Sequence, residues 1–161
     1  MQNKALVVID LQNDITKNYK EIIGNVNAAV DRAVANDWHV VYIRHEYLTP
    51  SAKTFLPNTV GSEFVADLKI VSANIFTKNV QNALSSAAFA DFLTENAITD
   101  LCIAGADATA CVKSTCLGLR KADYSVEVLS DCITSYRTDK IDEMLRYYED
   151  KGCKIITLSS M

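Results

Sequence analysis

The sequence predicts an α/β protein: a three-layer sandwich with a mostly parallel central sheet of about six strands and helices on both faces, in the manner of Rossmann-like folds. Short apolar runs rich in Val and Ile alternate with segments whose apolar residues recur at helical spacing. Such alternation favours parallel strands joined by helical crossovers. A length of 161 residues fits one domain, and no linker or repeat divides residues 1–161.

The expected elements follow one another in a regular order. Apolar, β-branched runs predict strands at residues 5–9, 39–43, 74–77, 100–104, 125–129 and 154–158. Periodic apolar residues predict helices at 19–36, 86–96, 109–122 and 139–150. The irregular segment 46–72 contains both prolines, and we expect a short helix around 62–68 within it. Long irregular segments often carry function, so we expect 46–72 to form part of a pocket rim.

Composition narrows the class of partner. Sixteen basic and twenty acidic residues give a net charge of −4, which argues against binding to nucleic acid or an anionic membrane surface. The five cysteines form no CxxC pair, and neither histidine stands with a cysteine at zinc-finger spacing. We therefore expect free thiols in a reduced, cytoplasmic protein, without a structural zinc site. No apolar run has the length of a signal peptide core or a membrane span.

Candidate functional residues follow the predicted strands. In parallel sheets, ligands bind beyond the carboxyl ends of the strands, near the reversal of strand order. Dinucleotide, P-loop and serine-elbow motifs are absent, which leaves Asp10, Lys78 and Cys111 as the chemically active candidates. A thiol in the first turn of a helix lies in a positive field that favours the thiolate, and the free N–H groups there can stabilise an oxyanion. Taken singly, each of the three has an ordinary structural explanation.

Taken together, the three residues stand in a frame that resembles the isochorismatase-like cysteine hydrolase family. The likeness begins with Ala5-Leu-Val-Val-Ile-Asp-Leu-Gln-Asn-Asp14 and continues through Lys78 to Ile98-Thr-Asp-Leu-Cys-Ile-Ala-Gly105. It closes on Cys111-Val-Lys-Ser-Thr115 and on the run 124–131, and so covers nearly the whole chain. The fold that this resemblance implies is the one that the alternating pattern predicts.

The resemblance implies a cysteine-dependent hydrolase that cleaves a C–N bond of a small amide, carbamoyl or ureido substrate through an acyl-enzyme thioester, without a cofactor. Cys111 would attack the carbonyl carbon, and Asp10 would take the thiol proton and pass it to the leaving amine. Lys78 would hold Asp10 ionised and favour the thiolate. The backbone N–H groups of Asp107 and Cys111 would form the oxyanion hole, and the Ala106–Asp107 peptide bond is a candidate for the cis form.

Three further polar residues are candidate substrate contacts. Arg44 suits a substrate carboxylate, although an internal salt bridge explains it better. His45 can tune the electrostatics of the site or serve as a hydrogen-bonded loop residue. Gln12 is equally suited to orienting substrate and to holding Asp10. The sequence departs from the family pattern at Ile15, Ala108 and Thr109, which affects substrate contacts more than the catalytic residues.

The resemblance points to a metal-free branch. The nicotinamidase branch carries a metal site built from an aspartate and histidines, but the run 44–47 holds a single histidine and none follows downstream. The branch that cleaves the vinyl ether of isochorismate usually lacks the cysteine that is present here as Cys111. The family also implies a homo-oligomer, a dimer or larger.

Two alternatives from other classes stay open. The first is a catalytically inactive scaffold that acts as a small-molecule binding or assembly protein. The second is a thiol-redox protein that pairs Cys111 with a resolving cysteine. Cys116 follows five residues later, which turns it to a different face of the predicted helix and counts against that pair.

Overall fold

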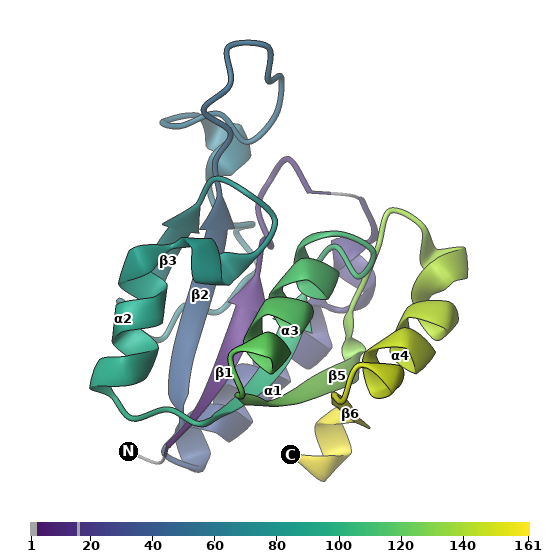
Figure 1. The fold of residues 1–161 in the computed structure, drawn as a ribbon. Coiled ribbons are helices and arrows are strands. Elements are labelled where there is room, and N and C mark those ends of the chain that lie inside the picture. Colours follow the sequence, from purple (N-terminus) through teal and green to yellow (C-terminus); the bar gives the residue numbers. More distant parts are fainter. Residues whose placement is uncertain (1–2, 16) are drawn as a thin grey trace.

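A six-stranded parallel sheet forms the centre of the computed structural model, which describes residues 3–15 and 17–161 (Figure 1). The strands, in the spatial order β3-β2-β1-β4-β5-β6, are β1 (Lys4–Ile9), β2 (His39–His45), β3 (Ile75–Lys78), β4 (Asp100–Gly105), β5 (Ser125–Ile133) and β6 (Lys154–Ile156). The helices are α1 (Ile23–Ala35), α2 (Ala87–Glu95), α3 (Cys111–Lys121) and α4 (Ile141–Asp150). The predicted fold class is confirmed.

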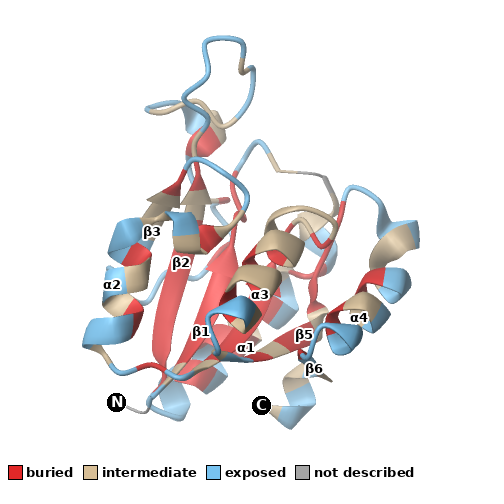
Figure 2. Cartoon of the chain, viewed as in Figure 1, coloured by how far each residue is buried: buried red, intermediate tan, exposed pale blue. Residues whose placement is uncertain are grey.

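The sheet separates two apolar layers. Val7 and Ile9 of β1 pack with the buried faces of α2, α3 and α4, whereas Leu6 and Val8 pack with α1 on the opposite face. Side chains alternate between the faces of a strand, so β1, which is apolar from Ala5 to Ile9, buries both of its faces. Figure 2 shows the resulting buried strands between partly exposed helices, and an exposed segment that projects past the end of β2.

The predicted helix around 62–68 is wrong. Val60–Ser62 forms one 3₁₀ turn, and Phe64 then makes an antiparallel bridge with Gln12. The N–H of Val65 donates to the carbonyl oxygen of Leu11 at 2.9 Å. The backbone of this segment therefore satisfies its hydrogen bonds with the loop after β1 instead of within a helix.

Other boundaries shift by a few residues. The helix expected at 19–36 begins at Ile23, after a separate 3₁₀ turn at Lys17–Glu21, and the helix expected at 109–122 begins at Cys111. The strand expected at 125–129 extends to Ile133, because the ladder resumes beyond a register shift with Gly105 paired to Ile133. The strand expected at 154–158 ends at Ile156. No helix in the described part of the chain is long and apolar enough to cross a membrane.

The strand order reverses between β1 and β4, and two backbone features mark that point. Gly105, at the end of β4, has φ +114°, and a Cβ atom there would lie 2.1 Å from the carbonyl oxygen of Ile9. Only glycine fits so close an approach of two strand ends. Asp10 directly follows β1 with φ 53°, in the left-handed region that few residues other than glycine adopt. The crevice expected for a parallel sheet opens here.

Candidate active site

Four elements bring the candidate residues to one place at the carboxyl end of the sheet. Asp10 follows β1, His45 ends β2, Lys78 ends β3 and Cys111 begins α3. His45 and Lys78 are direct neighbours in the parallel register of β2 and β3. Residues far apart in the sequence thus converge because parallel strands end at the same edge.

The ammonium group of Lys78 is the centre of the cluster. Its Nζ donates to Oδ2 of Asp10 at 2.9 Å and to Sγ of Cys111 at 3.3 Å, and lies 2.7 Å from Nδ1 of His45. The side chains of Lys78 and Asp10 are 0% and 3% exposed. An ammonium has three N–H donors, and three acceptors surround this one. A buried charge that is paired and fully hydrogen-bonded is the form in which proteins tolerate it.

The contact with Lys78 fixes the tautomer of His45. The lysine has no acceptor, so Nδ1 accepts and the proton of the neutral ring lies on Nε2. Burial and the charge of Lys78 lower the pKa of His45 to about 4, so the ring is neutral near pH 7. The rings of Tyr47 and Phe55 lie 4.3 and 5.8 Å from the imidazole, edge to face.

The resting state of Cys111 differs from the expected thiolate. Burial and the carboxylate of Asp10 raise the pKa of the Cys111 thiol to about 12, and the positive charge of Lys78 only partly opposes them. Burial likewise raises the pKa of Asp10, against the lowering effect of Lys78. Helix position and a nearby lysine are therefore insufficient, since desolvation of the thiolate outweighs them. The protonated thiol lies beside a carboxylate made more basic by burial.

The loop between β4 and α3 presents free backbone donors beside the thiol. The Ala106–Asp107 peptide bond, which the resemblance singled out, is cis. Ala106 and Ala108 donate their N–H groups to Ile9 and Thr134, but those of Asp107 and Cys111 have no main-chain acceptor in the described ranges. Both residues line the cavity over this cluster, so their N–H groups are candidate donors to an oxyanion.

The carboxylate of Asp107 anchors this loop. It accepts hydrogen bonds from the N–H and hydroxyl of Thr109, the hydroxyl of Ser135 and the N–H of Tyr136, all at 2.7 to 2.8 Å. The loop that carries the free donors is thus tied to the chain after β5. The sequence reasoning used only the main chain of Asp107, because Ser135 and Tyr136 come near only in the folded chain.

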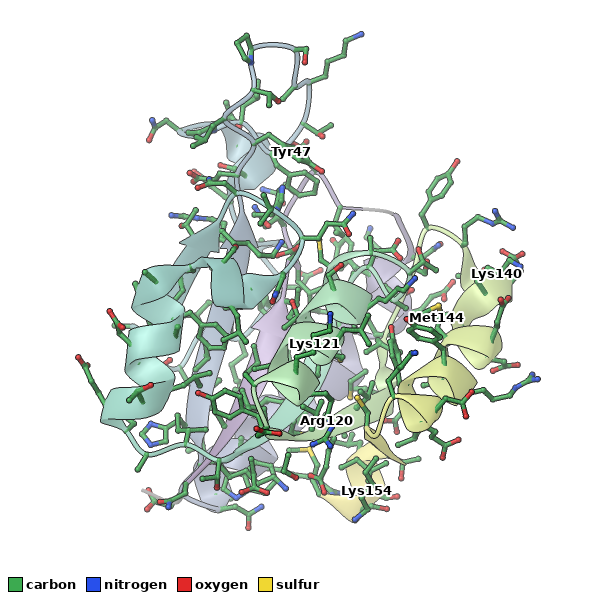
Figure 3. The ribbon with its side chains drawn as sticks, in the orientation of Figure 1. Tyr47, Arg120, Lys121, Lys140, Met144 and Lys154 are labelled. Carbon is green, nitrogen blue, oxygen red and sulfur yellow. The ribbon has the colours of Figure 1, made fainter. Side chains whose placement is uncertain are left out.

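A cavity of about 190 Å³ opens over the cluster. Asp10, His45, Asp107 and Cys111 contribute to its lining. Its other lining residues are Asp14, Ile15, Tyr47, Phe55, Gln81 and Ala110. Tyr47, labelled in Figure 3, lies at the base of the projecting segment. The expectation that segment 46–72 borders the pocket is confirmed by Tyr47 and Phe55, which sequence periodicity could not single out within an irregular stretch.

Two predicted substrate contacts do not line the cavity. The amide nitrogen of Gln12 donates to the carbonyl oxygens of His45 and Ser62, both at 2.8 Å, and its amide oxygen accepts the N–H of His45. Gln12 therefore clamps the chain after β2 instead of holding Asp10 or substrate. Arg44 forms an ion pair with Glu46, Nε to Oε1 at 3.4 Å, which is the internal salt bridge that the sequence reasoning preferred.

Asp10, His45 and Cys111 also form a potential metal-ligand set, because their donor atoms lie within 4.8 Å of one another. The Lys78 ammonium lies within hydrogen-bond distance of all three. This cation occupies the position that a metal ion would need, and it would repel one. The donor set therefore fits an ammonium and does not fit a divalent metal.

The other four cysteines are buried free thiols. A hydrogen bond with the Cys153 thiol, followed by burial, raises the pKa of Cys116, and both side chains belong to the same core cluster. Cys116 therefore faces Cys153 and not Cys111. The arrangement gives no support to the redox pair of Cys111 and Cys116.

The fold and the cluster define a class: a doubly wound α/β protein with a buried Cys–Asp–Lys constellation at its topological switch point. Residues 4–160 match the Isochorismatase domain, so the chain belongs to the isochorismatase family of hydrolases.

The chain is similar to one protein in sequence and to two others in fold. A probable inactive nicotinamidase of Arabidopsis thaliana is 28% identical over 81% of this chain and 80% of its own length. A pyrazinamidase of Pyrococcus horikoshii, solved in complex with zinc, has a TM-score of 0.87 at 23% identity and covers 97% of this chain and 99% of its own. An N-carbamoylsarcosine amidase of Thermoplasma acidophilum has a TM-score of 0.87 at 18% identity, over 99% of both chains.

Proposed function

We propose that this protein is a cysteine hydrolase that cleaves a C–N bond of a small amide, carbamoyl or ureido compound through a thioester on Cys111. The observation that carries the proposal is the single ammonium of Lys78 in contact with a carboxylate, a thiol and an imidazole. Ionisable groups with shifted pKa values in a cavity are typical of catalytic sites.

The first half of the reaction forms the thioester. Sγ of Cys111 attacks the carbonyl carbon as its proton passes to Asp10, whose Oδ1 is buried and has no hydrogen-bond partner among the described residues. The oxyanion takes the free N–H groups of Asp107 and Cys111. Asp10 then gives its proton to the nitrogen of the leaving amine, and the C–N bond breaks.

The second half returns the resting enzyme. Asp10, again ionised, takes a proton from a water molecule that attacks the thioester carbonyl, and the acid product leaves as Cys111 regains its proton. A thiol with a pKa near 12 is a poor thiolate source at neutral pH. Because the thiol proton passes to Asp10 during the attack, the thiolate does not have to form beforehand. Lys78 keeps its charge throughout and holds the reacting groups in place.

The zinc of the Pyrococcus relative has no part in the steps proposed for this chain. The acidic and imidazole donors near Cys111 surround Lys78 instead.

The second candidate is a catalytically inactive scaffold that binds a small molecule. The probable inactive nicotinamidase of Arabidopsis thaliana is the observation in its favour. Against it, the nucleophile, base and ammonium are assembled in mutual contact. The two candidates differ in whether an amine or ammonia is released.

The test is a panel of small amides, carbamoyl and ureido compounds, scored for ammonia or amine release. Cys111→Ala is expected to abolish release. Acid quenching should preserve an acyl group on Cys111 of the wild type, and hydroxylamine should release that group as a hydroxamic acid. Cys116→Ala, on the same helix, is the matched control and should retain activity. Release of ammonia or amine by Cys111→Ala would contradict the mechanism. Binding of a compound by the wild type without any release would favour the inactive scaffold.

The family resemblance also leads us to propose a homo-oligomer. Sedimentation velocity at several protein concentrations tests this, and a monomer throughout would contradict it.

A further inference from the structure

The cavity over Cys111 carries an excess of negative charge. Asp10, Asp14 and Asp107 all line it, and none of its described lining residues is Lys or Arg. Within the part of the chain that the structure describes, only the Asp10 carboxylate among these three forms an ion pair, with Lys78. Asp107 is satisfied entirely by neutral donors, and Asp14 accepts the N–H of Phe55 at 2.8 Å. Hydrogen bonds from neutral groups stabilise a carboxylate without cancelling its charge.

The nearby cations are not free to neutralise an acidic ligand. All three N–H donors of Lys78 are engaged by Asp10, His45 and Cys111. The imidazole of His45 is neutral near pH 7. Arg44 is paired with Glu46 and does not line the cavity.

Helix α3 carries three cations, and none of them lines the cavity. Lys113, two residues after Cys111, places its Nζ over the ring of Tyr147 in α4, 5.0 Å from the ring centroid. Arg120 and Lys121 occupy its last turn, whereas Cys111 is its first residue (Figure 3). A helix of 11 residues spans roughly 16 Å at 1.5 Å per residue. That distance exceeds the screening length of about 8 Å at physiological ionic strength.

We propose that the site takes an uncharged or cationic small amide and rejects amides that carry a carboxylate. The inference rests on the proposed function and adds the charge of its substrate. Asp14 is the specificity-determining residue, because it lines the cavity and no Lys or Arg among the described residues forms an ion pair with it.

The cavity walls add a second criterion, which is shape. Tyr47, Phe55 and Ile15 supply an apolar wall beside the polar cluster. Phe55 has φ 51°, and hydrogen bonds to Asp14 and from the N–H of Tyr47 hold it there. The part of the substrate that faces this wall is a short apolar or aromatic group, within a volume of about 190 Å³.

The rates at which charged thiol reagents modify Cys111 measure the electrostatic potential in the cavity, and this measurement does not require turnover. Cys111 is labelled with aminoethyl methanethiosulfonate, a cation, with the anionic sulfonatoethyl reagent and with the neutral methyl reagent. Rates at Cys111 are followed by peptide mass spectrometry and divided by the rates with β-mercaptoethanol. Cys111→Ser provides the background from the buried cysteines.

We expect the normalised cation-to-anion ratio to be about tenfold or more at low ionic strength and to fall with added salt. Asp14→Asn keeps an acceptor for the Phe55 N–H and should lower this ratio several-fold. Asp31→Asn removes a carboxylate that does not line the cavity and should leave the ratio unchanged. A normalised cation-to-anion ratio of about one means that Cys111 behaves as the free thiol does. Such a ratio, or one that favours the anion, overturns the proposal.

Three amides that share a two-carbon spacer and differ in the terminal group extend the test to turnover: butyramide, the cationic β-alaninamide and the anionic succinamate. We expect ammonia release with kcat/KM for the first two at least about tenfold above that for succinamate. Preferential cleavage of succinamate overturns the charge rule while hydrolysis stands. Cation-preferring labelling without release from a broad amide panel contradicts the proposed function and supports the charge rule.

Discussion

Nδ1 of His45 lies 2.7 Å from Nζ of Lys78, at the last register position shared by β2 and β3. A neutral imidazole here accepts one ammonium N–H and leaves the other two for Asp10 and Cys111. We therefore treat His45 as a positioning residue that aims the lysine at the reacting groups. This role is more specific than the electrostatic tuning suggested by its place in the sequence.

Replacing His45 tests that role. His45→Leu removes the acceptor, so the ammonium loses its orientation, and we expect kcat/KM on a cleaved amide to fall about tenfold or more. His45→Asn offers an oxygen near the position of Nδ1 and should restore part of the loss. The acid limb of the pH profile should move in His45→Leu and return in His45→Asn. If both variants lost the same amount of kcat/KM and neither moved the acid limb, His45 would contribute only to packing.

Asp10→Asn is expected to separate thiolate formation from catalysis. The carboxylate raises the pKa of Cys111, so its removal beside Lys78 should lower that pKa and speed iodoacetamide labelling of Cys111 at pH 7. Hydrolysis should fall about 10²-fold or more, because the proton acceptor is gone. Asp31→Asn is the control for both measurements. Slower labelling in Asp10→Asn would contradict the assignment of Asp10.

The pH profile of kcat/KM follows from the same cluster. Asp10 must be ionised to accept the thiol proton, and burial raises its pKa, so the acid limb should lie above the ordinary aspartate value of about 3.9. Because the pKa of Cys111 is about 12, no further rise from thiolate formation is expected between pH 7 and 9. A continued tenfold rise of kcat/KM per pH unit over that range would show that the attacking species is a thiolate formed before the substrate reacts.

Lys78→Met should destabilise the fold, and more so at higher pH. Without its partner, the buried Asp10 carboxylate costs about 3–5 kcal/mol, or less where the group can protonate. Its folded pKa is then raised further above the unfolded value, so stability is lost as pH rises through the folded pKa. Urea unfolding at pH 5 and 8 measures this.

Two variants check the interpretation of Lys78→Met. The double variant Lys78→Met with Asp10→Asn should recover much of the loss, because no buried charge remains. Lys69→Met breaks an exposed pair with Asp31 and should change the free energy of unfolding by less than about 1 kcal/mol. If the loss in free energy of unfolding caused by Lys78→Met were the same at pH 5 and pH 8, the argument would be contradicted.

Gly105→Ala should disrupt the end of the sheet. Its φ of +114° and a Cβ placed 2.1 Å from the oxygen of Ile9 imply a loss of about 2 kcal/mol or more, with loss of activity. Gly24→Ala meets nothing within 4 Å in helix α1 and should stabilise the protein by about 0.5–1 kcal/mol. Chemical denaturation of both variants provides the comparison, and a neutral Gly105→Ala would refute the close approach.

Local patterns were sufficient for most of the fold. The fully apolar run in β1 and the periodic apolar face of α1 come from neighbouring residues, so their types could be predicted. The segment around Val60–Phe64 was misjudged because its hydrogen bonds go to the loop after β1, which no local pattern records. The end of β5 was missed for the same reason, since it depends on the pairing of Gly105 with Ile133.

The sequence by itself determined the layered architecture, the family resemblance and the identity of Asp10, Lys78 and Cys111 as candidates. Only the tertiary structure decided how those groups meet: that His45 takes one donor of Lys78, that Gln12 clamps the backbone, and that Tyr47 and Phe55 wall the cavity. It also decided the protonation of Cys111. Residue types and spacings specify local preferences, whereas pKa values and hydrogen-bond partners depend on burial and on charges brought together by strands distant in sequence.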